Sequence, residues 1–182
     1  AGKYQEGPGE TACQECTTGN FCRKGAAAAL PCLAGTYSSA TGLVNASECD
    51  ACPEGSSCST GSRNHTLCAP GTVAPFPKSP SCTKCDPGTY QEQEGGTQCN
   101  TCTTCAAGKY MAAPCSAVTD AVCTDCPLGT YTDEAGQSSC TMCQKGVTFQ
   151  NGTGATDCKP CKACAWDEYQ PVACTPTMDA VC

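Results

Sequence analysis

The chain has 182 residues and 23 cysteines, a net charge of −7 and an aromatic fraction of 5%. So few large apolar side chains exclude one globular core, and the cysteine content is typical of a secreted scaffold held by disulfides. The acidic charge, without a Lys/Arg cluster, excludes a nucleic-acid surface, and without an apolar run of about 18 residues we expect no membrane contact by this segment.

The N-terminal half carries one cysteine spacing twice, which predicts modules at residues 1–49 and 50–84. The gaps x2, x5 and x9 separate Cys13, Cys16, Cys22 and Cys32, and 36 residues later the same gaps separate Cys49, Cys52, Cys58 and Cys68. The repetition at four positions indicates two copies of one small unit, the first of which begins inside a repeat.

The C-terminal half carries a second spacing twice, which predicts modules at residues 85–125 and 126–182. The gaps x2, x2, x9 and x7 separate Cys99, Cys102, Cys105, Cys115 and Cys123, and 59 residues later they separate Cys158, Cys161, Cys164, Cys174 and Cys182. A smaller unit is inserted in the last of these modules.

A shorter motif, Cys-x-x-Gly followed by an aromatic residue, runs through both halves. Clear copies are Cys32 to Tyr37, Cys85 to Tyr90 and Cys126 to Tyr131, while Cys68 and Cys143 begin copies without the tyrosine. Glycine permits the positive φ of a tight turn, and the flanking residues suit strands of two or three residues. Since no segment has a helical apolar stripe, we expect a small disulfide-rich fold: an elongated tandem array of cysteine-rich modules with short β-hairpins and almost no helix.

The spacing from Cys85 to Cys123, closed by Asp120-Ala121-Val122-Cys123, resembles a cysteine-rich domain of the tumour-necrosis-factor receptors. Asp179-Ala180-Val181-Cys182 echoes that ending. The N-terminal x2, x5, x9 spacing is more similar to ephrin-receptor-like cysteine-rich repeats. The two resemblances together cover nearly the whole chain.

The receptor resemblance implies a 1–2, 3–5, 4–6 disulfide pattern, which carries over to nine pairs and leaves two more. The nine carried-over pairs are Cys32–Cys49, Cys68–Cys82, Cys85–Cys99, Cys102–Cys115, Cys105–Cys123, Cys126–Cys140, Cys143–Cys158, Cys161–Cys174 and Cys164–Cys182. The two pairs that remain are Cys16–Cys22 and Cys52–Cys58. Cys13 is then unpaired in this fragment. Because the opening around Tyr4 resembles the motif around Tyr90, we expect its partner two positions before Ala1; the alternative is a free or intermolecular thiol.

Three sequons, at Asn45, Asn64 and Asn151, predict N-linked glycans and an extracellular or cell-surface location. Asn20 and Asn100 belong to the weaker Asn-x-Cys type, and we expect them to be unmodified.

The sequence contains only weak candidates for a metal site or a redox site. A four-cysteine zinc set comes near the usual spacing at Cys82, Cys85, Cys99 and Cys102. A calcium set would use Glu48, Asp50 and Glu54, but no twelve-residue calcium loop surrounds them. The Cys-x-x-Cys pairs lie at module junctions, each cysteine in a different bridge, so redox exchange is disfavoured. We expect no metal and no cofactor.

His65 is the one histidine of the chain, so a site with two imidazoles is excluded. We therefore expect no catalytic residues and no enzyme activity. Trp166 is interpreted as a cap on the last module, with a role as a contact anchor as the alternative.

The first functional hypothesis is a stalk, spacer or filament-wall segment of a larger extracellular glycoprotein. Such a segment acts through protein–protein contacts, with other modules or with copies of itself. The alternative is the ligand-binding ectodomain of a TNF-receptor-like receptor, in which the C-terminal modules grip a protein ligand. The sequence does not decide between them, because such repeats serve many roles.

Overall fold

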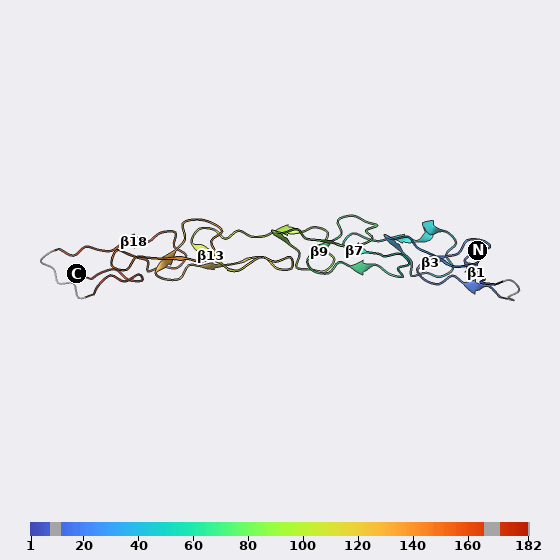
Figure 1. Ribbon diagram of the computed structural model, residues 1–182, viewed down its shortest axis with the longest axis horizontal. Helices are drawn as coiled ribbons and strands as arrows, with labels where there is room; N and C mark the ends of the chain where they lie inside the picture. The colour runs from blue at the N-terminus through green and yellow to red at the C-terminus, as the bar shows by residue number, and fades with distance from the viewer. Residues whose placement is uncertain (8–11, 166–171, 182) are drawn as a thin grey trace. The chain divides into compact units, whose positions relative to one another are not determined.

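The computed structural model describes residues 1–7, 12–165 and 172–181, and it consists of short antiparallel hairpins (Figure 1). The described residues form nine two-stranded sheets, and their one helical segment is the 3-10 turn η1 (Ala46–Glu48). The prediction of a small disulfide-rich fold of tandem hairpin modules is confirmed. No helix in the described ranges has the length and apolar character needed to cross a bilayer.

The strands are short, and each pairs with its neighbour in the chain. They are β1 (Lys3–Tyr4), β2 (Gln14–Glu15), β3 (Asn20–Phe21), β4 (Leu30–Pro31), β5 (Thr36–Tyr37), β6 (Asp50–Ala51), β7 (Ser56–Ser57), β8 (Thr66–Leu67), β9 (Thr72–Val73), β10 (Thr83–Lys84), β11 (Thr89–Tyr90), β12 (Asn100–Thr101), β13 (Lys109–Ala113), β14 (Val122–Asp125), β15 (Thr130–Tyr131), β16 (Thr141–Met142), β17 (Thr148–Phe149) and β18 (Lys159–Pro160).

The hairpins belong to two compact units. Unit 1 comprises Ala1–Thr101 and Ala117–Thr119 and holds the six sheets from β1–β2 to β11–β12. Unit 2 comprises Cys102–Ser116 and Asp120–Cys182 and holds β13–β14, β15–β16 and β17–β18. The finer division into four modules stays a prediction.

Disulfides take the place of an apolar core. The largest side chains below 2% exposure are Cys16, Cys22, Cys32, Cys52, Cys58, Cys68, Cys105, Cys126, Ser38 and Ser56. Closing a loop of about 13 residues by a disulfide stabilises the fold by about 3 kcal/mol in the chain-entropy model, far more than strands of two residues gain by pairing. Most hairpins are therefore stabilised by a disulfide within or beside them, whereas Cys13, in the loop of β1–β2, has no disulfide partner among the described residues.

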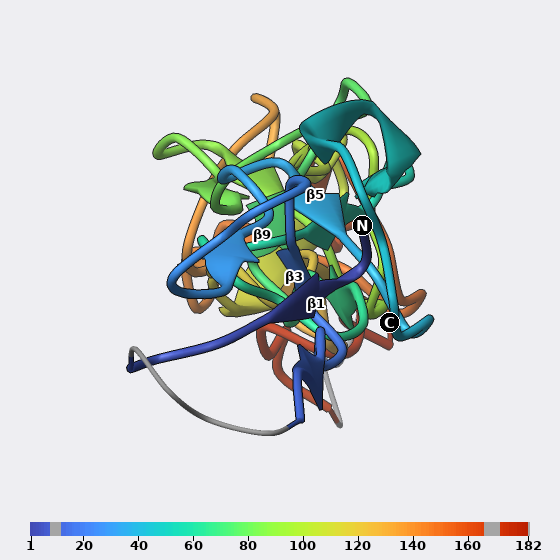
Figure 2. The ribbon, with the colours of Figure 1, turned by 90° about the vertical axis from the view of Figure 1, so that its right-hand side faces the viewer.

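The first strand of most hairpins carries one aromatic or apolar side chain, the exception being β7 with its two serines. In β5 this is Tyr37, which is half-buried and meets the ring of His65 edge-on with the ring centroids 5.4 Å apart. In β9 and β17, where the tyrosine is missing, Val73 and Phe149 are buried instead. In β3, labelled with β5 and β9 in Figure 2, the buried residue is Phe21. The copies that the sequence marked as degenerate are thus complete hairpins with another apolar residue in the same place.

The opening hairpin has the register of the later ones. Tyr4 in β1 is paired with Gln14 and donates its hydroxyl to that side chain over 2.8 Å. Tyr37 in β5 is paired with Asp50 in the same way. The similarity that the sequence indicated around Tyr4 therefore extends to the backbone.

Candidate protein-contact surface

Ten disulfides join described cysteines. They are Cys16–Cys22, Cys32–Cys49, Cys52–Cys58, Cys68–Cys82, Cys85–Cys99, Cys102–Cys115, Cys105–Cys123, Cys126–Cys140, Cys143–Cys158 and Cys161–Cys174. Eight of them have the pairing that the receptor resemblance implies, and Cys16–Cys22 and Cys52–Cys58 join the cysteines that the carried-over pattern left. Cys164 is also disulfide-bonded; its expected partner Cys182 lies outside the described residues, as do Trp166 and Tyr169.

Cys13 is the free cysteine of the described residues, and it is exposed. It lines an open hollow of about 460 Å³ together with Tyr4 and Ala26. Cys13 directly precedes β2, as Cys49 directly precedes β6, so it has the place of the second cysteine of a hairpin. Its thiol is open to an alkylating reagent or to another cysteine.

Two groups of side chains have the composition of a metal site, and both consist of a disulfide and an aspartate. They are Cys102, Cys115 and Asp120, and their repeats Cys161, Cys174 and Asp179. In each group the two sulfurs are bonded to each other, so neither is the thiolate that a metal requires. The four cysteines of the alternative zinc set are likewise all in disulfides.

The aspartates of these groups hold the backbone around their disulfides. The Asp120 carboxylate accepts the N–H of Thr103 over 2.7 Å, the hydroxyl of Thr103 over 2.6 Å and the N–H of Ala121 over 2.7 Å. The Asp179 carboxylate accepts the N–H groups of Lys162 and Ala180 over 2.7 and 2.8 Å. The Asp-x-Val-Cys ending that the sequence showed twice is therefore a backbone clamp, in which the aspartate carboxylate accepts hydrogen bonds from nearby backbone N–H groups.

Of the three acidic residues in the alternative calcium set, Glu48 stabilises its own turn. Glu48 accepts the N–H of Val44 over 3.1 Å and the side-chain amide of Asn45 over 3.4 Å, and so closes the turn at η1. The sequon asparagines Asn45, Asn64 and Asn151 are all exposed, as a glycan acceptor has to be.

The hairpins of unit 1 interlock through a glycine, each with the next hairpin but one along the chain. Gly35, directly before β5, has a φ of 84°. It donates its N–H to the carbonyl of Cys58 over 2.8 Å and accepts the N–H of Cys52 over 2.9 Å. The carbonyl oxygen of Lys78 lies less than 3.0 Å from the place that a Cβ atom on residue 35 would occupy. The same close approach is made by the pairs Gly2–Gly42, Gly19–Gly61 and Gly55–Gly95.

The residues whose carbonyls cover these glycines were not singled out in the sequence, although some of them share a constant spacing from a cysteine. Gly42 and Gly95 each lie ten residues after the first cysteine of their hairpin, Cys32 and Cys85. Lys78 has the equivalent position in its own hairpin, where it is the one described non-glycine residue with a positive φ. A search for glycines ten residues after each Cys-x-x-Gly cysteine would have found Gly42 and Gly95 but not Gly61, which lies nine residues after Cys52.

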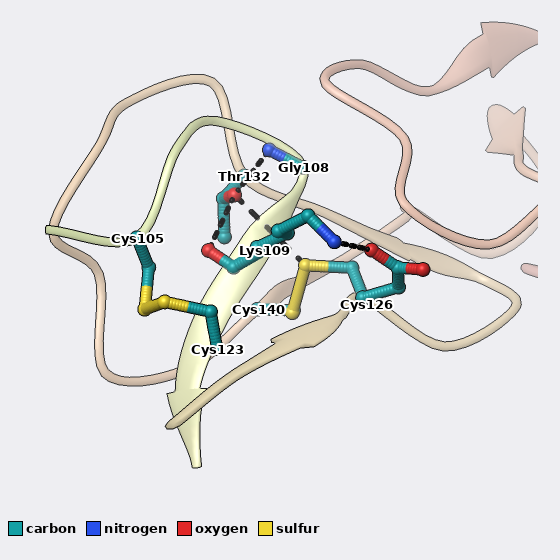
Figure 3. A network of polar contacts seen from close by, with 8 residues as sticks. Cys105, Gly108, Lys109, Cys123, Cys126, Thr132 and Cys140 are labelled. Carbon is teal, nitrogen blue, oxygen red and sulfur yellow. Dashed lines mark hydrogen bonds and ion pairs between the residues drawn. A yellow bond between two sulfur atoms is a disulfide. The ribbon is translucent and has the colours of Figure 1, made fainter. Parts of the chain in front are cut away.

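Unit 2 contains the same interlock at Gly108, and the buried Thr132 lies beside that glycine (Figure 3). The carbonyl of Gly154 covers Gly108. The Gly108 N–H donates to both the carbonyl and the hydroxyl of Thr132, over 2.8 and 2.9 Å. Next to Thr132, Lys109 and Asp125 form an ion pair of 2.5 Å, the one ion pair among the described residues. Because both of its side chains are about half exposed, this pair contributes little stability.

The larger apolar side chains lie mostly on the outside of these modules. Four of the five leucines are exposed, namely Leu30, Leu33, Leu67 and Leu128. Met142 in unit 2 is 72% exposed and lines an open hollow of about 480 Å³ with Tyr131 and Gln144. Phe76 in unit 1 is 71% exposed. Since cystines fill the interior, the apolar side chains that remain are available for contact with other molecules.

The comparisons with known proteins find the same two families, the ephrin-receptor-like one in another part of the chain than the sequence indicated. Residues 78–123 and 143–182 match the model of the TNFR/NGFR cysteine-rich region, and residues 114–161 match that of the tyrosine-protein kinase ephrin type A/B receptor-like family. The similarity to both kinds of receptor repeat is confirmed for these segments, and the ephrin-type match lies in the C-terminal half.

Among solved structures, a chain of the human RANKL/OPG complex is 19% identical over 65% of this chain and 91% of that chain, with a TM-score of 0.29. No curated protein sequence matches this chain.

Proposed function

We propose that this chain is a protein-binding, receptor-like segment of an extracellular or cell-surface glycoprotein. The observation that carries the proposal is the match of residues 78–123 and 143–182 to a receptor cysteine-rich region. The disulfide content and the exposed sequons at Asn45, Asn64 and Asn151 support the extracellular location.

The geometry favours a protein over a small molecule as the ligand. The buried interior consists mainly of cystines, and the hollows beside Cys13 and beside Met142 are open. A small ligand gains affinity from being enclosed, whereas a protein ligand can spread over outward-facing side chains such as Leu33 and Leu128. Recognition along the sides of the modules follows from this arrangement.

The test is a binding screen of the oxidised chain, multimerised on beads, against an array of extracellular domains from cell-surface and secreted proteins. We expect saturable binding of at least one domain, and its loss after reduction and alkylation, because the modules depend on their disulfides. The reduced and alkylated chain is the control. The proposal is wrong if the oxidised chain binds no domain, or if the alkylated chain binds as well as the oxidised one.

A spacer is the second candidate, and the repeated interlocks of unit 1 favour it. The carbonyls over Gly2, Gly19, Gly35 and Gly55 each join a hairpin to the next but one, which gives unit 1 the local rigidity that a stalk needs. A spacer tolerates substitution of its exposed apolar residues and fails when an interlock is broken. A binding segment, in contrast, fails when its exposed apolar residues are substituted and tolerates the loss of an interlock.

A further inference from the structure

The loop between β9 and β10, residues 74–80, displays an aromatic side chain that no core requires. Phe76 is 71% exposed, whereas the other two phenylalanines, Phe21 and Phe149, are 5% and 8% exposed and fill hairpins. Phe76 follows none of the Cys-x-x-Gly motifs at the usual offset. Large aromatic side chains in such positions are the residues from which protein interfaces gain most of their affinity.

The loop is held in one conformation before any partner arrives. Lys78 donates its N–H to the carbonyl of Cys52 over 2.8 Å, and the Ser79 carbonyl accepts the N–H of Cys58 over 3.1 Å. The Ser79 hydroxyl donates to the carbonyl of Phe76 over 2.7 Å. Three prolines, at positions 75, 77 and 80, restrict the remaining torsions. A side chain presented on so rigid a loop loses little conformational entropy when it is bound.

Lys78 has a backbone conformation that is adopted by glycine at the corresponding position of other loops. Its φ is 62°, in the left-handed region that disfavours residues with a Cβ atom. The corresponding residues of four other interlocks are Gly42, Gly61, Gly95 and Gly154. The lysine therefore holds a strained place that glycine would fill without strain, and strain of this kind collects where a side chain is needed for function.

The stretch of sequence around the loop is basic, although the chain as a whole is acidic. Residues 55–85 contain no Asp or Glu, and they contain Arg63, Lys78 and Lys84, in a chain with a net charge of −7. The one ion pair among the described residues does not involve Lys78. A partner whose surface carries carboxylates complements this segment, and the same charge would be repelled by most of the remaining chain.

We infer that the 74–80 loop is a contact surface for a protein partner that presents an apolar pocket bordered by carboxylates. Phe76 fills the pocket, and the Lys78 ammonium pairs with the carboxylates. The inference rests on the proposed function and names the surface through which unit 1 carries it out. Phe76, with no charge of its own, favours a protein over an acidic polysaccharide as the partner.

The probe is a phage-displayed library of random dodecapeptides, selected on the oxidised chain. We expect the selected peptides to combine Asp or Glu with Trp, Phe or Leu, and to lose about tenfold or more in affinity for Phe76→Ser. Val147→Ser, which alters an exposed apolar side chain in unit 2, is the matched control and leaves the affinity unchanged.

Lys78→Gly separates a binding role from a structural one. Glycine relieves the positive φ, so we expect this variant to unfold at a higher denaturant concentration and at the same time to bind the peptides several-fold more weakly. A variant that is more stable and binds less well cannot owe its lost binding to misfolding.

The inference is overturned if the selected peptides bind Phe76→Ser as well as the original chain, or if Lys78→Gly leaves their affinity unchanged. Binding to heparin that depends on Lys78 and is indifferent to Phe76 would identify a polysaccharide site and also overturn it. If an extracellular domain from the array binds both variants normally, this inference fails and the proposed function stands. If no domain binds the original chain, the proposed function itself fails.

Discussion

The carbonyl oxygen of Lys78 lies where a side chain on Gly35 would have to begin. Two restrictions coincide at Gly35, because its φ of 84° already disfavours any residue with a Cβ atom. The contact joins one hairpin to a loop more than forty residues further along the chain. Its repetition at other glycines makes it the element that orders the hairpins of unit 1.

Gly35→Ala is expected to destabilise unit 1 by about 3 kcal/mol, from the left-handed backbone and the collision with Lys78 together. Gly88→Ala is the first control: its φ is 85° but no atom lies within 4 Å, so the expected cost is about 1 kcal/mol. Gly7→Ala, with neither restriction, should change little. Guanidinium denaturation with the disulfides intact measures all three, and equal losses at Gly35 and Gly88 would show that the carbonyl contact is unimportant.

Lys78→Gly is expected to stabilise unit 1 by a few tenths to about 1 kcal/mol. The relief of the positive φ of 62° outweighs the larger entropy of glycine in the unfolded chain. The same denaturation experiment measures it, with Lys84→Gly in strand β10 as the control that should destabilise. A loss of stability in Lys78→Gly would mean that the lysine side chain supports the fold.

Asp120→Ala is expected to destabilise unit 2 by about 2 kcal/mol, because it leaves the Thr103 and Ala121 N–H groups without their charged acceptor. Amide hydrogen exchange is the direct measurement: both amides should exchange faster. Asp133→Ala, an exposed aspartate of the same unit, should leave their exchange unchanged. Unaltered protection of Thr103 in Asp120→Ala would contradict the clamp.

The disulfide pattern predicts one reactive thiol per chain, at Cys13. Alkylation of the oxidised chain of residues 1–182 should modify one cysteine, and Cys13→Ser should abolish the reaction. Non-reducing peptide mapping should find Cys102 bonded to Cys115 and Cys105 bonded to Cys123. A bridge between Cys102 and Cys123 would show that the receptor pattern does not apply.

Glycan attachment is predicted at Asn45, Asn64 and Asn151, all exposed in the structure. Each Asn→Gln variant, secreted from a eukaryotic cell, should lose one increment of mass that peptide N-glycosidase removes from the original chain. Asn20 and Asn100, in Asn-x-Cys sequences, are the internal controls and should be unmodified. An unchanged mass in any of the three variants would remove that site from the prediction.

The sequence by itself determined the disulfide-rich fold and its hairpins. Cysteine spacing is a covalent constraint that is visible without coordinates, and a glycine at a fixed offset from each cysteine marks a tight turn. For the same reason the receptor resemblance could be stated from Cys85 to Cys123. The pattern also indicated where the aromatic residue lies, but it did not show that Val73 and Phe149 serve where tyrosine is absent, because burial depends on the partner strand.

The tertiary structure alone decided which loops meet. The approach of Lys78 to Gly35, the clamp of Asp120 on Thr103 and the cover of Gly154 over Gly108 all join residues far apart in the chain, and no local periodicity encodes them. The strain at Lys78 and the exposure of Phe76 are properties of backbone geometry and of neighbouring atoms, so composition could not reveal them. Local covalent spacing thus fixed the modules, while the non-local contacts between backbone carbonyls and glycines fixed how hairpins within a unit pack and which side chains face outward.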